Sequence, residues 1–116
     1  MESPSALNVL SYEGAKFCDE ISDFCEKEGI SIRGLSKICN GSETGLSKST
    51  AERILKGTVN PELLEQLRPV LFEGLYKFLE CQRHHADEIE QILSPIFNKQ
   101  EFTNMLNDRC ELDALA

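Results

Sequence analysis

The chain has 116 residues, of which 41% are hydrophobic and 28% are charged. This length fits one domain, and the composition is that of a folded globular protein rather than a disordered one. No apolar run approaches the ~18–20 residues that span a bilayer, and the amino terminus lacks a basic region and a cleavage-like site, so neither insertion nor secretion is expected. Five cysteines without a C-x-x-C pair favour reduced thiols in a cytoplasm over a disulfide framework or a zinc ribbon.

The charges are distributed unevenly along the chain. The net charge of −8 argues against a protein that coats nucleic acid or anionic lipid. Residues 31–57 nevertheless hold five Lys or Arg and two Asp or Glu, a net +3, whereas the segments before and after them are acidic. A functional interpretation therefore has to explain one short basic segment inside an acidic chain.

Three short helices are predicted in the amino-terminal half. Phe17, Ile21 and Phe24 recur at spacings of four and three, which indicates an amphipathic helix over about residues 12–28. Residues 40–45 are turn formers, and they separate a second short helix from a third whose inward residues are Ala51, Ile54 and Leu55. The expected helix ends are two glycine stops, Gly29 and Gly57, and three N-caps, Ser31, Ser47 and Asn60, with Pro61 at the first helical position after Asn60.

The carboxy-terminal half is expected to continue as helix. Pro69 is expected to force a break or a fresh helix start, and Ser94-Pro95 to close the long helix that follows. Asn98 and Glu101 have the spacing of an N-cap and its reciprocating partner for a last helix, and the chain after Cys110 is expected to be loose. Seven positions of the long helix form a heptad seam: Leu71, Leu75, Phe78, Gln82, His85, Ile89 and Ile92.

No alternating strand pattern of convincing length occurs, so the predicted fold class is all-α. The expected architecture is a small helical bundle with an amino-terminal helix-turn-helix over residues 1–68 and a helical extension over residues 69–116. The heptad seam has two interpretations. It either pairs two protomers, as palindromic operators require, or packs inside one chain; we favour the homodimer.

The third helix presents its polar side away from the core. Ser49, Arg53 and Lys56 lie opposite the inward residues, and the capped amino terminus of the helix offers N–H groups to a phosphate. In a helix-turn-helix this outward face meets the major groove of double-stranded DNA. The candidate DNA-binding residues are Arg33, Lys37, Ser47, Lys48, Ser49, Thr50, Arg53 and Lys56.

The string SIRGLSK, followed by GLSKSTAERILKG and a proline, resembles the helix-turn-helix of the Cro and Xre-type phage repressors. The resemblance covers residues 32–61. It implies that Ser47 caps the recognition helix, that residues 48–50 lie at its groove-entering end, and that Ala51 and Ile54 pack on the preceding helix. It also implies that Gly57 ends the recognition helix.

The segment departs from that family in three places. The turn from Cys39 to Leu46 is longer, and Ser36 stands where a small apolar alanine is usual. Glu52 puts an acid on the expected DNA face, where it could either repel phosphate or accept a hydrogen bond from a cytosine amino group.

The function predicted from these features is a sequence-specific DNA-binding transcriptional regulator of bacterial, phage or mobile-element type. The same charges also fit an ordinary solvated helix face. The second functional interpretation is an acidic interaction or inhibitor protein, an adaptor or DNA mimic, that keeps the helix-turn-helix fold and meets a protein partner through its acidic helices.

Neither a metal site nor catalysis is predicted. His84 and His85 lie near Cys81, Asp87 and Glu88, but a tetrahedral site would need another ligand, for which Cys110 is the only nearby candidate. A partly buried histidine at a helix interface is therefore the preferred interpretation of His85. The sequence contains no nucleophile elbow, Gly-rich phosphate loop or H-E-x-x-H motif, so we expect no enzyme and no cofactor.

Overall fold

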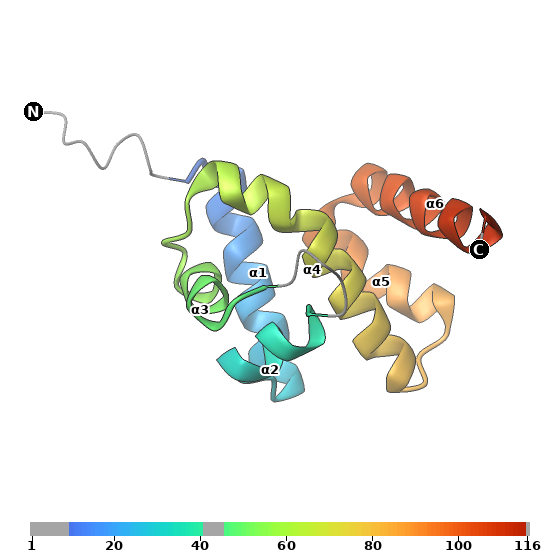
Figure 1. Cartoon of the computed structure of the whole chain (residues 1–116), viewed down its shortest axis with the longest axis horizontal. Helices are drawn as coiled ribbons and strands as arrows, with labels where there is room; N and C mark the ends of the chain where they lie inside the picture. Colours follow the sequence, from blue (N-terminus) through green and yellow to red (C-terminus); the bar gives the residue numbers. More distant parts are fainter. Residues whose placement is uncertain (1–9, 41–45, 116) are drawn as a thin grey trace, which may run out of the picture.

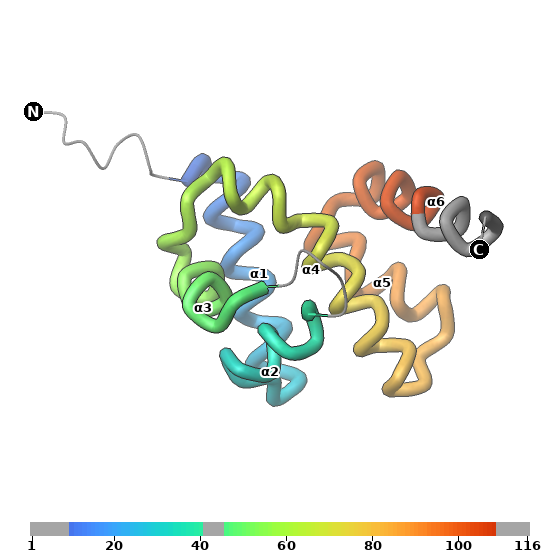
Figure 2. Tube along the Cα trace, in the orientation of Figure 1, coloured from blue at the N-terminus to red at the C-terminus, as the bar shows by residue number. Residues whose placement is uncertain are grey.

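The fold is all-α, as predicted. The computed structural model describes residues 10–40 and 46–115, with side chains to residue 108, and these residues contain six helices and no strand (Figure 1). The helices are α1 (Tyr12–Glu28), α2 (Ile32–Ile38), α3 (Lys48–Lys56), α4 (Pro61–Cys81), α5 (Ala86–Phe97) and α6 (Lys99–Leu115). The trace in Figure 2 places α2 and α3 toward one end of the molecule and α6 toward the other.

The N-caps at Ser31 and Ser47 and the glycine stops at Gly29 and Gly57 are those the sequence predicts. The Ser31 hydroxyl accepts from the Gly34 amide at 3.0 Å, and the Ser47 hydroxyl accepts from the Thr50 amide at 3.2 Å. Gly29 and Gly57 end α1 and α3 with φ of 72° and 73°, a region that costs other residues energy. Local side-chain chemistry thus sets where the amino-terminal helices begin and end.

The expected break at Pro69 is wrong, because α4 runs through this residue to Cys81. Proline deprives the Glu65 carbonyl of its helical donor, but Pro69 lies on the exposed side of α4, where that carbonyl can bind water. Leu67 and Leu71 on the other side are buried, and their burial holds both halves of the helix in line. The boundary expected between residues 68 and 69 therefore falls inside one continuous helix.

The prediction of one continuous helix through the heptad positions is also wrong. α4 ends at Cys81, Arg83 has a φ of 69°, and α5 then turns back along α4 (Figure 1). Gln82 and His85 are exposed in this connection and belong to no seam. A heptad spacing is satisfied equally well when its two parts lie on successive helices of a hairpin, so the pattern could not reveal the break.

The proposed dimer seam is consequently used inside the chain. Leu71 and Leu75 have 0% exposure, and Ile89 has 1%, so these side chains have no surface left for a second protomer. Phe78 and Ile92 are partly buried against the same core. A dimer through this seam is not part of the function proposed below.

The last two helices differ from the prediction at three points. Pro95 lies inside α5, which continues to Phe97, and α6 extends to Leu115 instead of loosening after Cys110. The cap at Asn98 is confirmed, since its side chain accepts from the Glu101 amide at 2.8 Å. The Glu101 carboxylate does not return to Asn98; it binds Arg68 instead.

Aromatic rings join the helices into one core. Phe72 of α4 lies edge-to-face against Phe97 of α5 and Phe102 of α6, with ring centroids 5.6 Å and 5.5 Å away. Phe97 in turn meets Phe17 of α1 at 5.2 Å. Such contacts stabilise by about 0.5–1.5 kcal/mol beyond the area they bury. The helix-turn-helix and the helical extension therefore share a core.

A close contact between α2 and α4 should make Gly74→Ala destabilising. A Cβ at Gly74 would lie 2.6 Å from Cys39 Sγ and 3.0 Å from the Ile38 carbonyl oxygen, so the end of α2 would have to move. We expect a loss of about 1–3 kcal/mol in urea unfolding. Gly14→Ala is the matched control, because its nearest contact is 3.4 Å and alanine favours a helix. Equal stability of the two variants would contradict this packing.

Buried thiols should make the fold sensitive to alkali. Burial raises the pKa of Cys18 and Cys25 to about 11 and that of Cys39 to about 12. A thiol whose pKa is higher in the folded state stabilises fully below its unfolded pKa, near 9, and this contribution falls as pH rises toward the folded value. The free energy of unfolding should therefore decrease above about pH 9, and less steeply in Cys39→Ala. Cys81→Ala, at an exposed position, is the control.

Candidate nucleic-acid interface

The exposed side of α3 is the centre of the candidate site. Ala51 and Ile54 are fully buried where α3 packs on α1 and α2, as the sequence predicts. Lys48, Ser49 and Arg53 are exposed on the opposite side. The inward and outward assignments of α3 are therefore confirmed, and what the outward side binds is a separate question.

The amino-terminal end of α3 is held by its cap. Besides accepting from the Thr50 amide, the Ser47 hydroxyl donates to Thr50 Oγ1 at 2.9 Å. These two side chains are thus satisfied by each other, while Lys48 and Ser49 extend into solvent. The first N–H groups of a helix lack carbonyl partners within it. This end of α3 therefore attracts an anion through its N–H groups as well as through the charge of Lys48.

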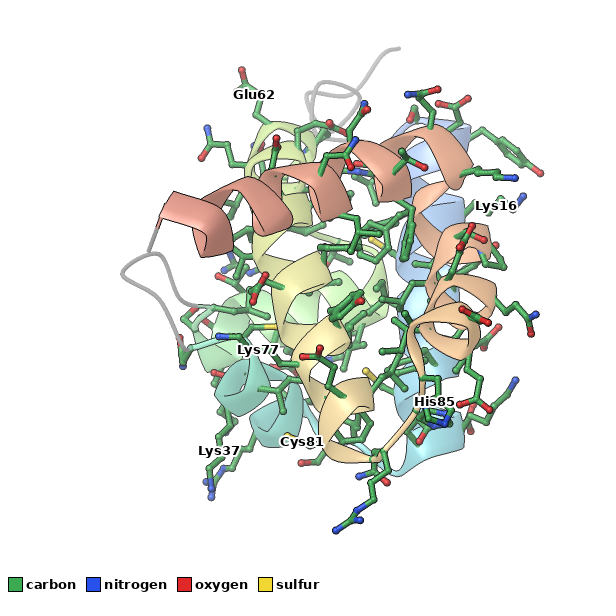
Figure 3. The ribbon with its side chains drawn as sticks, turned by 90° about the vertical axis from the view of Figure 1, so that its right-hand side faces the viewer. Lys16, Lys37, Glu62, Lys77, Cys81 and His85 are labelled. Carbon is green, nitrogen blue, oxygen red and sulfur yellow. The ribbon has the colours of Figure 1, made fainter. Side chains whose placement is uncertain are left out.

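Two further cations lie on α2. Arg33 and Lys37 are four residues apart and exposed, and Lys37 points away from the body of the protein in Figure 3. Because α2 packs on α3, all five cations of the basic segment lie on two helices in contact. The structure thus gathers the predicted basic residues on the helix-turn-helix.

Glu52 changes the charge of this surface. Its carboxylate lies 2.8 Å from Lys56 Nζ, one helical turn away. The hydrogen bond and charge of Lys56, followed by the charges of Lys48 and Arg53, lower the pKa of Glu52. Lys56 therefore has its charge compensated by Glu52 before any ligand binds. The sequence analysis missed this pair, although the i, i+4 spacing of the two residues indicates it.

Ser36 links α2 to the residue that precedes the cap of α3. Its side chain is 9% exposed, and its hydroxyl donates to the Leu46 carbonyl at 2.6 Å. Asn40 Nδ2 donates to the same hydroxyl oxygen at 3.4 Å, and the Leu46 side chain is buried. The hydroxyl therefore ties the start of the α3 segment to α2, a task that alanine could not perform. Residues 41–45 of the predicted turn lie outside the described residues.

The histidines occupy the α4–α5 connection and its helix start. The expectation of a partly buried His85 is wrong: His85 is exposed, and its amide donates to Glu88 Oε1 at 2.9 Å at the start of α5. That hydrogen bond is the main cause that lowers the pKa of Glu88, and His84 Nδ1 lies 3.5 Å from the same oxygen. Within the described part of the chain no group of three metal ligands forms, and the Cys110 side chain lies outside it.

Comparisons with known proteins add no family assignment. Neither a family model, nor a curated protein, nor a solved structure matches this chain. Among the residues whose structure is described, none of the helices has both the length and the apolar character needed to cross a membrane.

Loss of the Ser36 hydroxyl should loosen the connection to α3. Ser36→Ala leaves the Leu46 carbonyl without its donor, so we expect the free energy of unfolding to fall by about 1 kcal/mol. Ser49→Ala removes a hydroxyl from an exposed position of α3 and should be neutral or slightly stabilising. Chemical unfolding of both variants measures the difference. If Ser36→Ala unfolds like the wild type, the hydrogen bond does not stabilise the turn.

Proposed function

We propose that this protein is a sequence-specific, double-stranded DNA-binding regulator of transcription that acts in the cytoplasm of a bacterium, on host, phage or mobile-element DNA. The observation that carries the proposal is the exposed basic side of α3, set on α1 and α2 in the order of a helix-turn-helix. The resemblance of residues 32–61 to the Cro and Xre-type repressors supports it. Regulation would follow from occupancy of an operator and would need no catalysis or cofactor.

The candidate DNA-binding residues would contact different parts of the duplex according to their positions on α2 and α3. Lys48 and the amino-terminal turn of α3 suit a phosphate at the groove edge, and Arg33 and Lys37 on α2 suit the flanking backbone. Ser49 and Arg53 face outward in the middle of α3, where side chains reach base edges. An arginine there can donate two hydrogen bonds to guanine, which gives sequence preference beyond the charge attraction.

Glu52 would act as a brake on non-specific binding. It compensates the charge of Lys56 on the free protein, and in the groove it would repel phosphate unless it accepts a hydrogen bond from a cytosine amino group. Affinity for random DNA comes mostly from the neutralisation of phosphates by cations. Compensation of Lys56 by Glu52 therefore lowers that affinity without removing a specific contact. The pair thus favours discrimination over tight general binding.

Charge variants of α3 test the proposal by the salt dependence of DNA binding. Reversal of Arg53 and Lys56 to Glu should weaken binding to a labelled duplex in anisotropy titrations while circular dichroism is unchanged, because both side chains are exposed. Each neutralised phosphate contributes about 0.9 to the slope of log affinity against log salt. Lys48→Gln, which removes the cation placed at a phosphate, should therefore lower the slope by about this amount.

Glu52→Gln sharpens the same experiment, because it frees Lys56. Affinity for random duplex should rise and the slope should steepen by up to about 0.9. Glu90→Gln, an equal charge change on α5, controls for the general effect of lost negative charge. Wild-type binding with no salt dependence, or α3 variants that bind like the control, would refute DNA binding and favour the acidic adaptor or inhibitor interpretation.

A further inference from the structure

A second surface of the molecule, away from α3, has the features of a protein-binding groove. It lies between α1 and α5 and has a volume of about 560 Å³, inside the ~300–1,000 Å³ range of clefts that bind ligands. The residues that line it come from two stretches: Glu20, Asp23, Phe24, Lys27 and Glu28 of α1, and Gln91, Ile92, Pro95 and Ile96 of α5. Figure 3 shows α5 lying alongside α1 on this side of the protein.

The floor of the groove is apolar. Phe24 is buried beneath it, and Ile92 and Ile96 are only partly buried although they pack on the core. Pro95 is exposed between them. These side chains therefore present a short apolar strip to solvent, with Ile92 and Ile96 one helical turn apart.

The rim of the groove is acidic and uncompensated. Glu20, Asp23 and Glu28 line it together with one cation, Lys27, which leaves a net charge of −2. None of the three carboxylates takes part in an ion pair among the described residues. An apolar strip on α5 beside unpaired carboxylates on α1 fits a ligand that has apolar side chains along one face and cations beside them.

Pro95 adds a hydrogen-bond acceptor to the same place. Proline has no N–H, so the carbonyl of Gln91, four residues earlier, does not receive the usual helical hydrogen bond. Both residues line the groove. A lysine or arginine side chain of a ligand could donate to this carbonyl as well as to the carboxylates.

The groove is accessible when α3 is engaged. α1 packs on α3 with one side and on α5 with another, and in Figure 1 α3 and α5 lie on opposite sides of α1 and α4. A second copy of this chain is a poor occupant, because each copy carries a net charge of −8 and would meet an acidic rim. The groove is thus complementary to a different, basic protein.

We propose that the groove between α1 and α5 binds a basic amphipathic helix of a partner protein. Apolar residues of that helix at positions i, i+3 and i+4 would lie on Ile92 and Ile96, and its lysines or arginines would face Glu20 and Asp23. The inference is independent of DNA binding. If both hold, the protein brings such a partner to its DNA site.

Synthetic peptides of about four helical turns test the proposal. One carries Leu at i, i+3, i+4 and i+7 with Lys and Arg elsewhere; a second has the same leucines with Glu in place of the cations; a third has the composition of the first in scrambled order. We expect the full-length protein to bind only the first peptide saturably, with a chemical-shift change at the groove residues. Binding of the scrambled peptide with equal affinity would mean charge attraction alone and would overturn the proposal.

Variants locate the binding site. Asp23→Lys at the rim and Ile92→Ser at the floor should each weaken binding of the basic amphipathic peptide by about tenfold. Glu62→Lys has the same charge change as Asp23→Lys but lies on α4, away from the groove in Figure 3, and should bind like the wild type. Asp23 is exposed, so its variant keeps the test valid if Ile92→Ser unfolds.

Three further outcomes would refute the proposal that the groove binds a basic helix. These are equal affinity of Asp23→Lys and Glu62→Lys, absence of saturable binding by the wild type, and a concentration-dependent dimer that dissociates in Ile92→Ser. The last result would make a second copy the occupant. DNA binding of Asp23→Lys, measured in parallel, should equal that of Glu62→Lys, which has the same charge change, and this separates the inference from the function proposed for α3.

Discussion

The contact of Arg68 with Phe17 and Glu101 holds the two halves of this molecule together. The guanidinium carbon lies 4.1 Å from the centroid of the Phe17 ring, and Nε and Nη2 donate to the two carboxylate oxygens of Glu101 at 2.7 Å and 2.6 Å. The hydrogen bonds to Glu101 raise the pKa of Arg68. The Arg68 side chain is only 14% exposed, and a guanidinium so far out of water is stable only while it is paired. The helices α1, α4 and α6 must therefore keep their relative positions.

Through this contact α1 is held between α3 and the carboxy-terminal helices. Phe17 reaches the core of the extension through Phe97, while another side of α1 supports α3. The helical extension is therefore not a separate unit beside the first three helices; it stabilises α1, the helix on which α3 packs. The same arrangement leaves the groove between α1 and α5 on the far side, so one helix supports two surfaces of opposite charge.

The basic and acidic side chains of this protein are concentrated on different surfaces. An acidic chain with a net charge of −8 is repelled by a polyanion at long range, and the cations of α2 and α3 oppose that repulsion locally. Glu52 weakens this surface further by compensating Lys56. If α3 binds DNA as proposed, its affinity depends on a fitted set of contacts, whereas a uniformly basic protein binds any duplex. The acidic remainder then stays available for the basic partner proposed for the groove.

The sequence by itself determined the local features: the all-helical class, the caps at Ser31 and Ser47, the stop at Gly57, and the inward and outward sides of α3. Each of these depends on residues within one or two helical turns, which a pattern can detect. Tertiary structure decided whether helices continue or break. α4 passes Pro69 because its other side is buried, the heptad pattern divides between α4 and α5, and Ser36 meets Leu46 across a turn. Arg68 and Glu101 are 33 residues apart, and no local pattern encodes a contact over that separation, because it exists only when the core brings the helices together.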